Sequence, residues 1–134
     1  MTTTTTIVDK LRILLALCAE HAQHLTGDTL ISGEVLGYSE GLVLMLDSDH
    51  GGLSVLGWAL DALTDPEVTA STSANGVVHV AVRGTYLRQP VDVRMTVKDN
   101  ADAERLLAVA GEDARAGRGS VTVEQFRELA AVSS

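Results

Sequence analysis

Two neighbouring segments in the second half of the chain alternate apolar and polar residues with a period of two. The apolar sets are Val78, Val80, Val82 and Tyr86 in the first segment, and Val91, Val93, Met95 and Val97 in the second. This period is that of a β-strand, whose successive side chains point to opposite faces. We therefore expect two adjacent antiparallel strands that share one buried face and carry their polar residues on the other.

The same alternation predicts the register of the pair. We place the reversal at residues 87–90, which sets Val82 opposite Met95 and makes the two apolar faces coincide. A slip by one residue would bury Arg94 instead. The Asn-Gly pair at residues 75–76 predicts a type I′ hairpin turn before the first strand, because that turn needs two positive φ angles.

Helical periodicity and turn residues give the remaining elements. We expect helices over residues 7–26 and 53–63, strands over 30–36 and 42–46, and a polar loop over 112–119. A helix capped by Asp99 or Asn100 should end at Ala110, before Gly111. A capping box of Thr122 and Gln125 opens the last helix. The first helix should turn an apolar stripe inward, made of Ile7, Leu11, Leu14, Leu15, Cys18, Ala22 and Leu25.

The order of these elements predicts one α+β domain over residues 7–134, after a flexible tail at residues 1–6. The expected order is helix, two strands, helix, three strands and two helices. It predicts an antiparallel sheet of about five strands with helices packed mainly on one face. The length of 134 residues suits a single core.

Composition and charge exclude several classes of protein. Apolar residues make up 46% of the chain, which argues against disorder, and the net charge of −8 argues against nucleic acid as a partner. The single cysteine, Cys18, excludes an intramolecular disulfide. No apolar run is long enough to span a membrane. We expect a cytoplasmic protein.

Three motifs that suggest chemistry have simpler explanations. Residues 37–41 match G-x-S-x-G, but a nucleophile elbow joins a strand to a helix, and here a strand follows. Residues 47–52 resemble a calcium loop, but lack its third ligand and its final glutamate. His21 and His24 could share a metal, but no third ligand is near in sequence. We assign no catalytic residue, metal site or cofactor.

One feature suggests binding, namely the polar face of the two alternating strands. Segment 76–98 carries a net charge of +3 in a chain of net charge −8. In the predicted register Arg83 lies opposite Arg94, and His79 lies opposite Lys98. This face is either an ordinary solvated surface, with Asp92 and Glu67 interleaved among its cations, or a docking surface. A docking surface would bind an acidic partner, or the acidic helices of a second copy of this chain in a dimer. The candidate binding residues are His79, Arg83, Arg88, Arg94 and Lys98.

We therefore expect a non-catalytic interaction module, an accessory or regulatory protein, that forms a homodimer. The apolar segments 42–46 and 53–63 need cover on nearly all sides, and a second subunit would supply it. One alternative is a small enzyme or ligand carrier with a pocket between the 38–40 turn and the 47–50 loop. Another is an acidic inhibitor that mimics nucleic acid.

Overall fold

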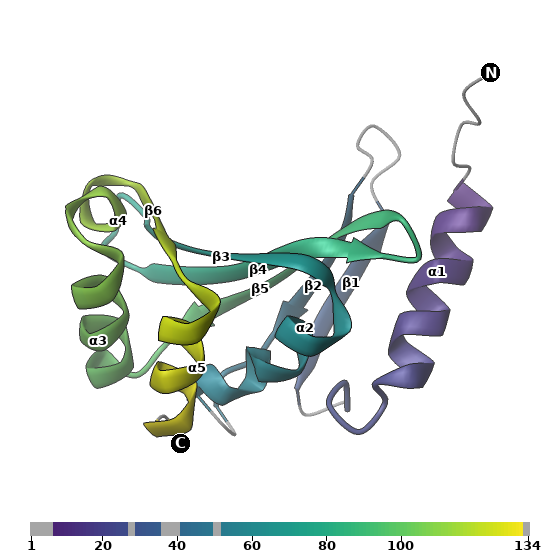
Figure 1. Ribbon diagram of the computed structural model, residues 1–134, viewed down its shortest axis with the longest axis horizontal. Coiled ribbons are helices and arrows are strands. Elements are labelled where there is room, and N and C mark those ends of the chain that lie inside the picture. Colours follow the sequence, from purple (N-terminus) through teal and green to yellow (C-terminus); the bar gives the residue numbers. More distant parts are fainter. Residues whose placement is uncertain (1–6, 27–28, 36–40, 50–51, 133–134) are drawn as a thin grey trace.

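The centre of the molecule is a six-stranded sheet with the strand order β1-β2-β5-β4-β3-β6 (Figure 1). The computed structural model describes residues 7–26, 29–35, 41–49 and 52–132. The strands are β1 (Leu30–Val35), β2 (Leu42–Leu46), β3 (Thr64–Thr72), β4 (Val78–Tyr86), β5 (Gln89–Val97) and β6 (Arg118–Val121). The helices are α1 (Ile7–Glu20), the 3-10 helix η1 (Gly52–Leu56), α2 (Gly57–Ala62), α3 (Asn100–Ala110), α4 (Glu112–Ala116) and α5 (Val123–Val132). The predicted α+β class is confirmed.

Neighbouring strands are antiparallel except for β2 and β5, which run parallel. After β2 the chain passes through η1 and α2 and returns as β3 at a distance from β2. The β4–β5 hairpin then fills the space between β3 and β2. A parallel pair needs such a helical crossover, because a tight turn can join only antiparallel strands.

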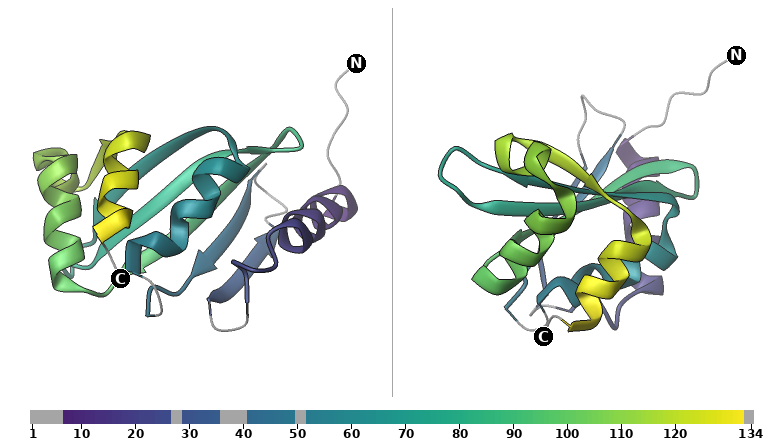
Figure 2. Two further views of the ribbon diagram at one scale, coloured as in Figure 1. Left: turned by 60° about the horizontal axis from the view of Figure 1, so that its bottom comes forward. Right: turned by 60° about the vertical axis from the view of Figure 1, so that its left-hand side comes forward.

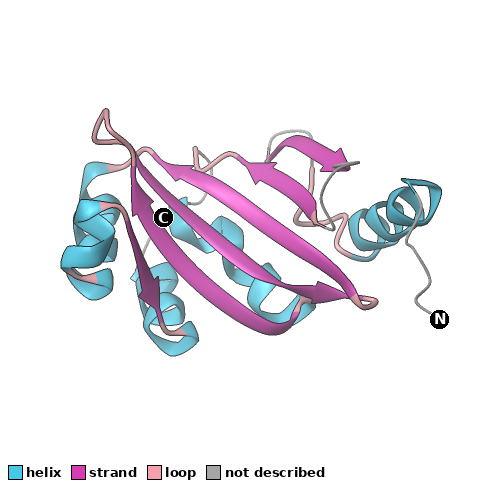
Figure 3. Ribbon diagram, turned by 90° about the horizontal axis from the view of Figure 1, so that it is seen from above, coloured by secondary structure: helices cyan, strands magenta, loops and turns pink. Residues whose placement is uncertain are grey.

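The two faces of the sheet differ in what covers them. Helices α2, α3 and α5 lie against one face, and α1 lies beside β1 at the end opposite α3 (Figures 1 and 2). The covered face carries the alternating apolar residues of the strands, including Val80, Val82, Val93 and Met95, all at most 1% exposed. Figure 3 looks onto the other face, where no described helix lies across β3, β4 and β5. We call this the open face.

The predicted register of β4 and β5 is wrong by two residues. Val80 lies opposite Met95, and Val82 lies opposite Val93. The reversal uses two residues, Leu87 and Arg88, with φ of 50° and 69°. Because a shift of two keeps every side chain on its own face, the predicted buried face is correct.

The other hairpin also differs from its predicted turn type. The reversal at Asn75-Gly76 is present. A type I′ turn needs positive φ at both residues, but of these two only Gly76 has a positive φ, at 80°. The Gly76 N–H donates to the Ser73 carbonyl, and the Ser73 N–H donates to the Val77 carbonyl. This is the pattern of a three-residue loop, in which one left-handed glycine follows an ordinary turn.

Two predicted helices are shorter than expected. The first ends at Glu20, and segment 53–63 divides into η1 and α2 at Gly57, a residue that weakens helix interiors. β3 begins directly at Thr64, where we expected only a helix end. Its ladder is irregular between Thr64 and Glu67, and Pro66 occupies that irregularity, where a strand tolerates a missing N–H.

The capping predictions are confirmed. Asp99 accepts a hydrogen bond from the Asp102 N–H at 2.9 Å and begins α3, which ends before Gly111. Thr122 and Gln125 exchange the two hydrogen bonds of a capping box, at 3.0 and 3.1 Å. Segment 112–119, however, is not a loop, because it contains α4 and the start of the edge strand β6.

Candidate docking face of the sheet

The centre of the open face is an ion cluster of Arg83, Asp92 and Arg94. Arg83 and Asp92 are cross-strand partners on β4 and β5, and Arg94 follows Asp92 on the same face of β5. Arg94 donates to Asp92 Oδ2 through Nε at 3.0 Å and through Nη2 at 2.8 Å. Arg83 Nε lies 3.6 Å from the same oxygen. The predicted Arg83–Arg94 pairing is therefore wrong, because the two-residue shift places a carboxylate opposite Arg83.

This cluster carries one more positive charge than negative charge. The Asp92 side chain is only 10% exposed, whereas the Arg83 and Arg94 side chains are 53% and 51% exposed. Asp92 Oδ1 is buried and has no hydrogen-bond partner among the described residues. The Asp92 carboxylate thus contacts two half-exposed guanidinium groups and orients that of Arg94 through two hydrogen bonds.

A hollow of about 430 Å³ lies on one side of the cluster, and we call it the Arg118 hollow. Ala81 contributes its small side chain to the lining, and Arg118 of β6 and His79 of β4 lie at its far end. Ser71 of β3 is the register partner of both Arg118 and His79. The His79 ring is oriented by a 3.1 Å hydrogen bond between Nδ1 and Thr96 Oγ1.

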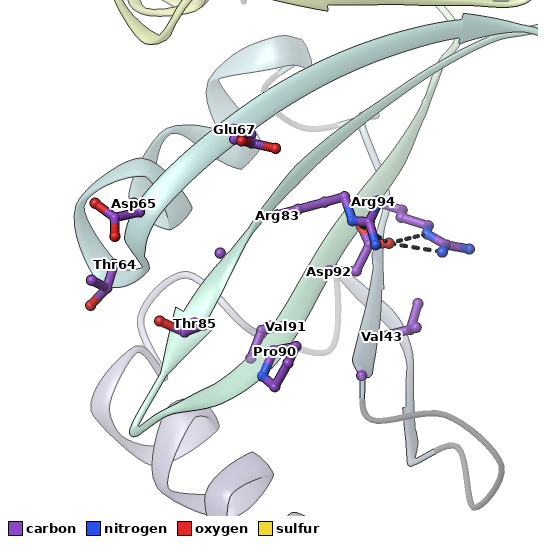
Figure 4. Close-up of a pocket in the computed structure, with 12 residues that line it drawn as sticks. Val43, Thr64, Asp65, Glu67, Arg83, Thr85, Pro90, Val91, Asp92 and Arg94 are labelled. Atoms are coloured by element: carbon purple, nitrogen blue, oxygen red, sulfur yellow. Dashed lines mark hydrogen bonds and ion pairs between the residues drawn. The ribbon is translucent and has the colours of Figure 1, made fainter.

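A second hollow of about 470 Å³ lies on the other side of the cluster, toward the β4–β5 turn (Figure 4). We call it the Glu67 hollow. Asp65 and Glu67 of β3 border it, together with Thr85 and Pro90 from the end of the hairpin. The Arg83 side chain extends toward Asp92 and away from Glu67 in this view.

Three of the five predicted binding residues lie together on this face, namely His79, Arg83 and Arg94. The other two do not join them. Arg88 lies in the hairpin turn, five residues beyond Arg83, which is roughly 17 Å along an extended strand. Lys98 lies past the opposite end of β5 and pairs with two carboxylates of the loop after β2. His79 faces Thr96, so its predicted pairing with Lys98 is also wrong.

Lys98 forms two ion pairs at the end of the sheet, and its side chain is 52% exposed. Lys98 Nζ lies 3.2 Å from Asp47 Oδ1 and 3.0 Å from Asp49 Oδ1. Both hydrogen bonds raise the pKa of Lys98, that of Asp49 more strongly. The pKa of Asp47 is lowered, first by the hydrogen bond from the Asp49 N–H and then by Lys98.

Sequence reasoning missed Arg118 and Asp65, whereas Glu67 was expected among the cations of this face. Arg118 lay in a segment interpreted as a loop, and Asp65 lay at an expected helix end. The signal for Arg118 was the alternation of segment 118–121, in which Gly119 and Val121 are buried and Arg118 and Ser120 are exposed. Four residues with one large apolar side chain are too few to identify a strand.

The other candidates from the sequence do not form a site in the described part of the chain. Residues 37–40 of the G-x-S-x-G motif and residue 50 of the 47–50 loop lie outside the described residues. The predicted pocket between those loops therefore does too. His24 stacks on Trp58 with ring centroids 6.2 Å apart, and His21 lies 5.1 Å from the same ring. Within the described ranges, no three possible ligand residues gather around a metal position. Burial raises the pKa of the Cys18 thiol.

None of the helices in the described ranges has the length and apolar character needed to cross a bilayer. No protein-family model, no curated protein and no solved structure matches the chain.

Proposed function

We propose that this chain is a non-catalytic interaction module, an accessory or regulatory protein of the cytoplasm, that docks an acidic segment of a partner protein on its open face. One observation carries the proposal. Three strands bring Arg83, Arg94, Arg118 and His79 around one hollow on a face without helical cover. These cations gather in a chain whose net charge is −8.

The charges of this hollow favour an anion. Three arginines and one carboxylate, that of Asp92, line this hollow, and Arg118 makes no ion pair with any described residue. The guanidinium groups are exposed enough to contact a ligand, and guanidinium binds carboxylates through paired, directional hydrogen bonds. On an ordinary solvated face, by contrast, the exposed charges are screened by salt and bind no partner. Measured affinity separates the two.

The test is a binding titration with defined peptides. A fluorescein-labelled hexapeptide of glutamate should bind at low ionic strength, and a lysine hexapeptide should not. Arg118→Glu should weaken binding about tenfold or more, because it replaces an attraction with a repulsion. Added salt should weaken it further. Fluorescence anisotropy measures each affinity.

The matched control is Arg127→Glu on α5, which makes the same change in charge. Arg127 lies in the helical layer and pairs with the exposed Asp61 at 2.7 Å. This variant should bind the glutamate peptide within about twofold of the wild type, a difference of only a few tenths of a kcal/mol. Equal losses in the two variants would mean that net charge, and not the open face, governs binding. The docking proposal would then be wrong.

We also propose that the chain forms a homodimer, but through α1. The apolar segments that first suggested a dimer are covered within one subunit: Leu42, Leu44, Leu53 and Leu56 are fully buried. That reason for a dimer is wrong. The surplus apolar surface lies on α1 instead, where Ile7, Val8, Leu11 and Leu15 are between 44% and 69% exposed.

The predicted apolar stripe of α1 is divided between two directions. Leu17 is fully buried and Leu14 packs against the core, whereas the four exposed residues occupy an adjoining arc of about 100°. A helix with so wide an apolar surface is normally buried over most of that surface. A second copy of α1 across a two-fold axis offers an identical apolar arc. Sedimentation velocity should give a dimer for the wild type and a monomer for Leu11→Asp/Leu15→Glu.

The control for this experiment is Val132→Glu, which changes an apolar residue of α5 that is equally exposed, at 65%. It should leave the dimer intact. A wild-type chain that sediments as a monomer at tens of micromolar would exclude the α1 dimer.

A further inference from the structure

The two hollows of the open face form one continuous trough. The Arg118 hollow and the Glu67 hollow share Arg83, Asp92 and Arg94, and they follow each other along β4 and β5. Along β4 the trough extends from Thr85 to His79, which is roughly 20 Å at the rise of an extended strand. An extended peptide of about six residues spans the same length.

Outside the shared cluster, the two hollows of this trough carry opposite charges. The Glu67 hollow is bordered by two exposed acidic residues of β3, namely Glu67, which is the register partner of Arg83, and Asp65, which lies nearer the β4–β5 turn. The Arg118 hollow contains the guanidinium group of Arg118 and the imidazole of His79. Asp65, Glu67 and Arg118 make no ion pair within the described ranges, so their charges are available to a ligand.

This arrangement discriminates between kinds of anionic partner. A uniformly acidic segment or a nucleic acid strand would place negative charge against Asp65 and Glu67 while it binds Arg118. Like charges brought together in this way cost binding energy and select against the wrong partner. A segment with its acidic and basic residues separated meets the opposite charge at both ends.

We infer that the trough binds an extended peptide segment of about six residues whose charges are segregated. Its acidic end lies against Arg118 and His79, and its basic end lies against Asp65 and Glu67. The Arg83–Asp92–Arg94 cluster lies under the middle of the segment. This inference rests on the proposed docking function and specifies the partner's charge pattern.

The test compares three capped, labelled hexapeptides by fluorescence anisotropy. One has two glutamates, two glycines and two lysines in that order, the second has the same composition with its charges interleaved, and the third is all glutamate. The segregated peptide should bind wild-type protein about tenfold or more tighter than either of the others. Arg118→Glu should weaken its binding by at least that factor.

Two further variants test the acidic end of the trough. Glu67→Lys should weaken the binding of the segregated peptide and strengthen the binding of the all-glutamate peptide, so that the all-glutamate peptide becomes the tighter ligand. Glu128→Lys makes the same charge change at an exposed position on α5 and should leave the wild-type order unchanged.

The outcomes separate this inference from the function on which it rests. If the three peptides bind equally and Arg118→Glu weakens them all, the docking face stands and the charge segregation is wrong. If the all-glutamate peptide binds wild-type protein most tightly, the segregation is also wrong. If Arg118→Glu changes no affinity, both proposals fail.

Discussion

Leu87 and Arg88 form the two-residue turn between β4 and β5 with left-handed backbone angles that normally favour Asn and Gly. Their φ values are 50° and 69°, and Leu87 is 64% exposed, so packing of the Leu87 side chain does not explain its presence there. For an L-residue with a side chain, the left-handed backbone conformation costs roughly 1 kcal/mol or more. The turn is therefore a local source of instability that the strand pairing offsets.

Replacing this turn with Asn-Gly should stabilise the protein. We expect Leu87→Asn/Arg88→Gly to raise the free energy of unfolding by about 1 kcal/mol, because the left-handed conformation then carries little cost. Urea unfolding measures the change. Gly76→Ala is the converse control: φ at Gly76 is 80°, nothing lies within 4 Å of an added Cβ, and stability should fall by about 1 kcal/mol. An unchanged or lower midpoint in the Asn-Gly variant would contradict the argument.

For single residues, the sequence indicated on which face of the sheet a side chain of β4 or β5 lies, but not which residue it pairs with on the neighbouring strand. The alternation of valines identified the buried face of β4 and β5, because burial depends on whether each side chain is apolar or polar. The register depended on the turn, and Leu87-Arg88 lacks the residues that identify a two-residue turn. The error of two residues left His79, Arg83 and Arg94 on the predicted face but hid the Arg83–Asp92 pair.

β6 is the element that depends most on its surroundings. It has four residues, pairs with β3, and contacts α3 and α4. A Cβ on Gly119 would lie 2.9 Å from both the Ala110 carbonyl oxygen and the Ala114 backbone nitrogen. Such distances are too short for real contacts, so the strand can approach the helices this closely only with glycine there.

Gly119→Ala should therefore destabilise the protein by about 1–3 kcal/mol, as overpacking does elsewhere. Chemical denaturation measures the loss, and amide exchange should be fastest in β6 and α4. Gly57→Ala, where nothing lies within 4 Å of the new Cβ and the residue is helical, should keep or raise stability. Equal stability of Gly119→Ala and wild type would mean that β6 does not need this close approach.

A second element-scale contact joins α1 to the end of β4. The Tyr86 hydroxyl donates a hydrogen bond to Glu20 Oε2, and this bond raises the pKa of Tyr86 to about 12. Because the folded pKa lies above the ordinary value near 10, the contact contributes to stability fully below pH 10 and is lost as pH rises toward 12.

The ultraviolet absorbance of tyrosinate tests this contact. The chain has two tyrosines, and we expect one of them to titrate near 12 in the folded protein. That step should disappear in Tyr86→Phe and move toward 10 in Glu20→Gln, because the charged acceptor is gone. Two ordinary titrations near 10 in the wild type would show that α1 is not held to β4 in this way.

At the element scale, prediction succeeded where a signal was local and failed where packing decided the outcome. The caps of α3 and α5 depend on two or three adjacent residues and were found from the sequence. β6 and the irregular start of β3 depend on neighbours far away along the chain. These two segments also carry Arg118 and Asp65, so the candidate site was only partly visible from the sequence.

For the whole molecule, the sheet divides the surface into a helical side and an open side, and α1 stands apart at one end (Figure 2). The need for cover on segments 42–46 and 53–63 was recognised correctly from their composition. The sequence did not indicate that the domain itself supplies this cover, because the cover depends on α2, α3 and α5 packing against the same face of the sheet. The unmatched apolar surface of α1 became evident only once its packing partner, β1, was known.

If α1 forms the interface of a dimer, the stability of the fold must depend on protein concentration. Dimer formation stabilises the folded state by mass action, so each tenfold rise in concentration should add about 1.4 kcal/mol per dimer. The urea midpoint of the wild type should therefore rise between roughly 1 μM and roughly 100 μM protein. The midpoint of Leu11→Asp/Leu15→Glu should not move, because both positions are exposed in one subunit and the change removes only the interface. A wild-type midpoint that is independent of concentration would mean that the apolar arc of α1 is not covered by a second copy.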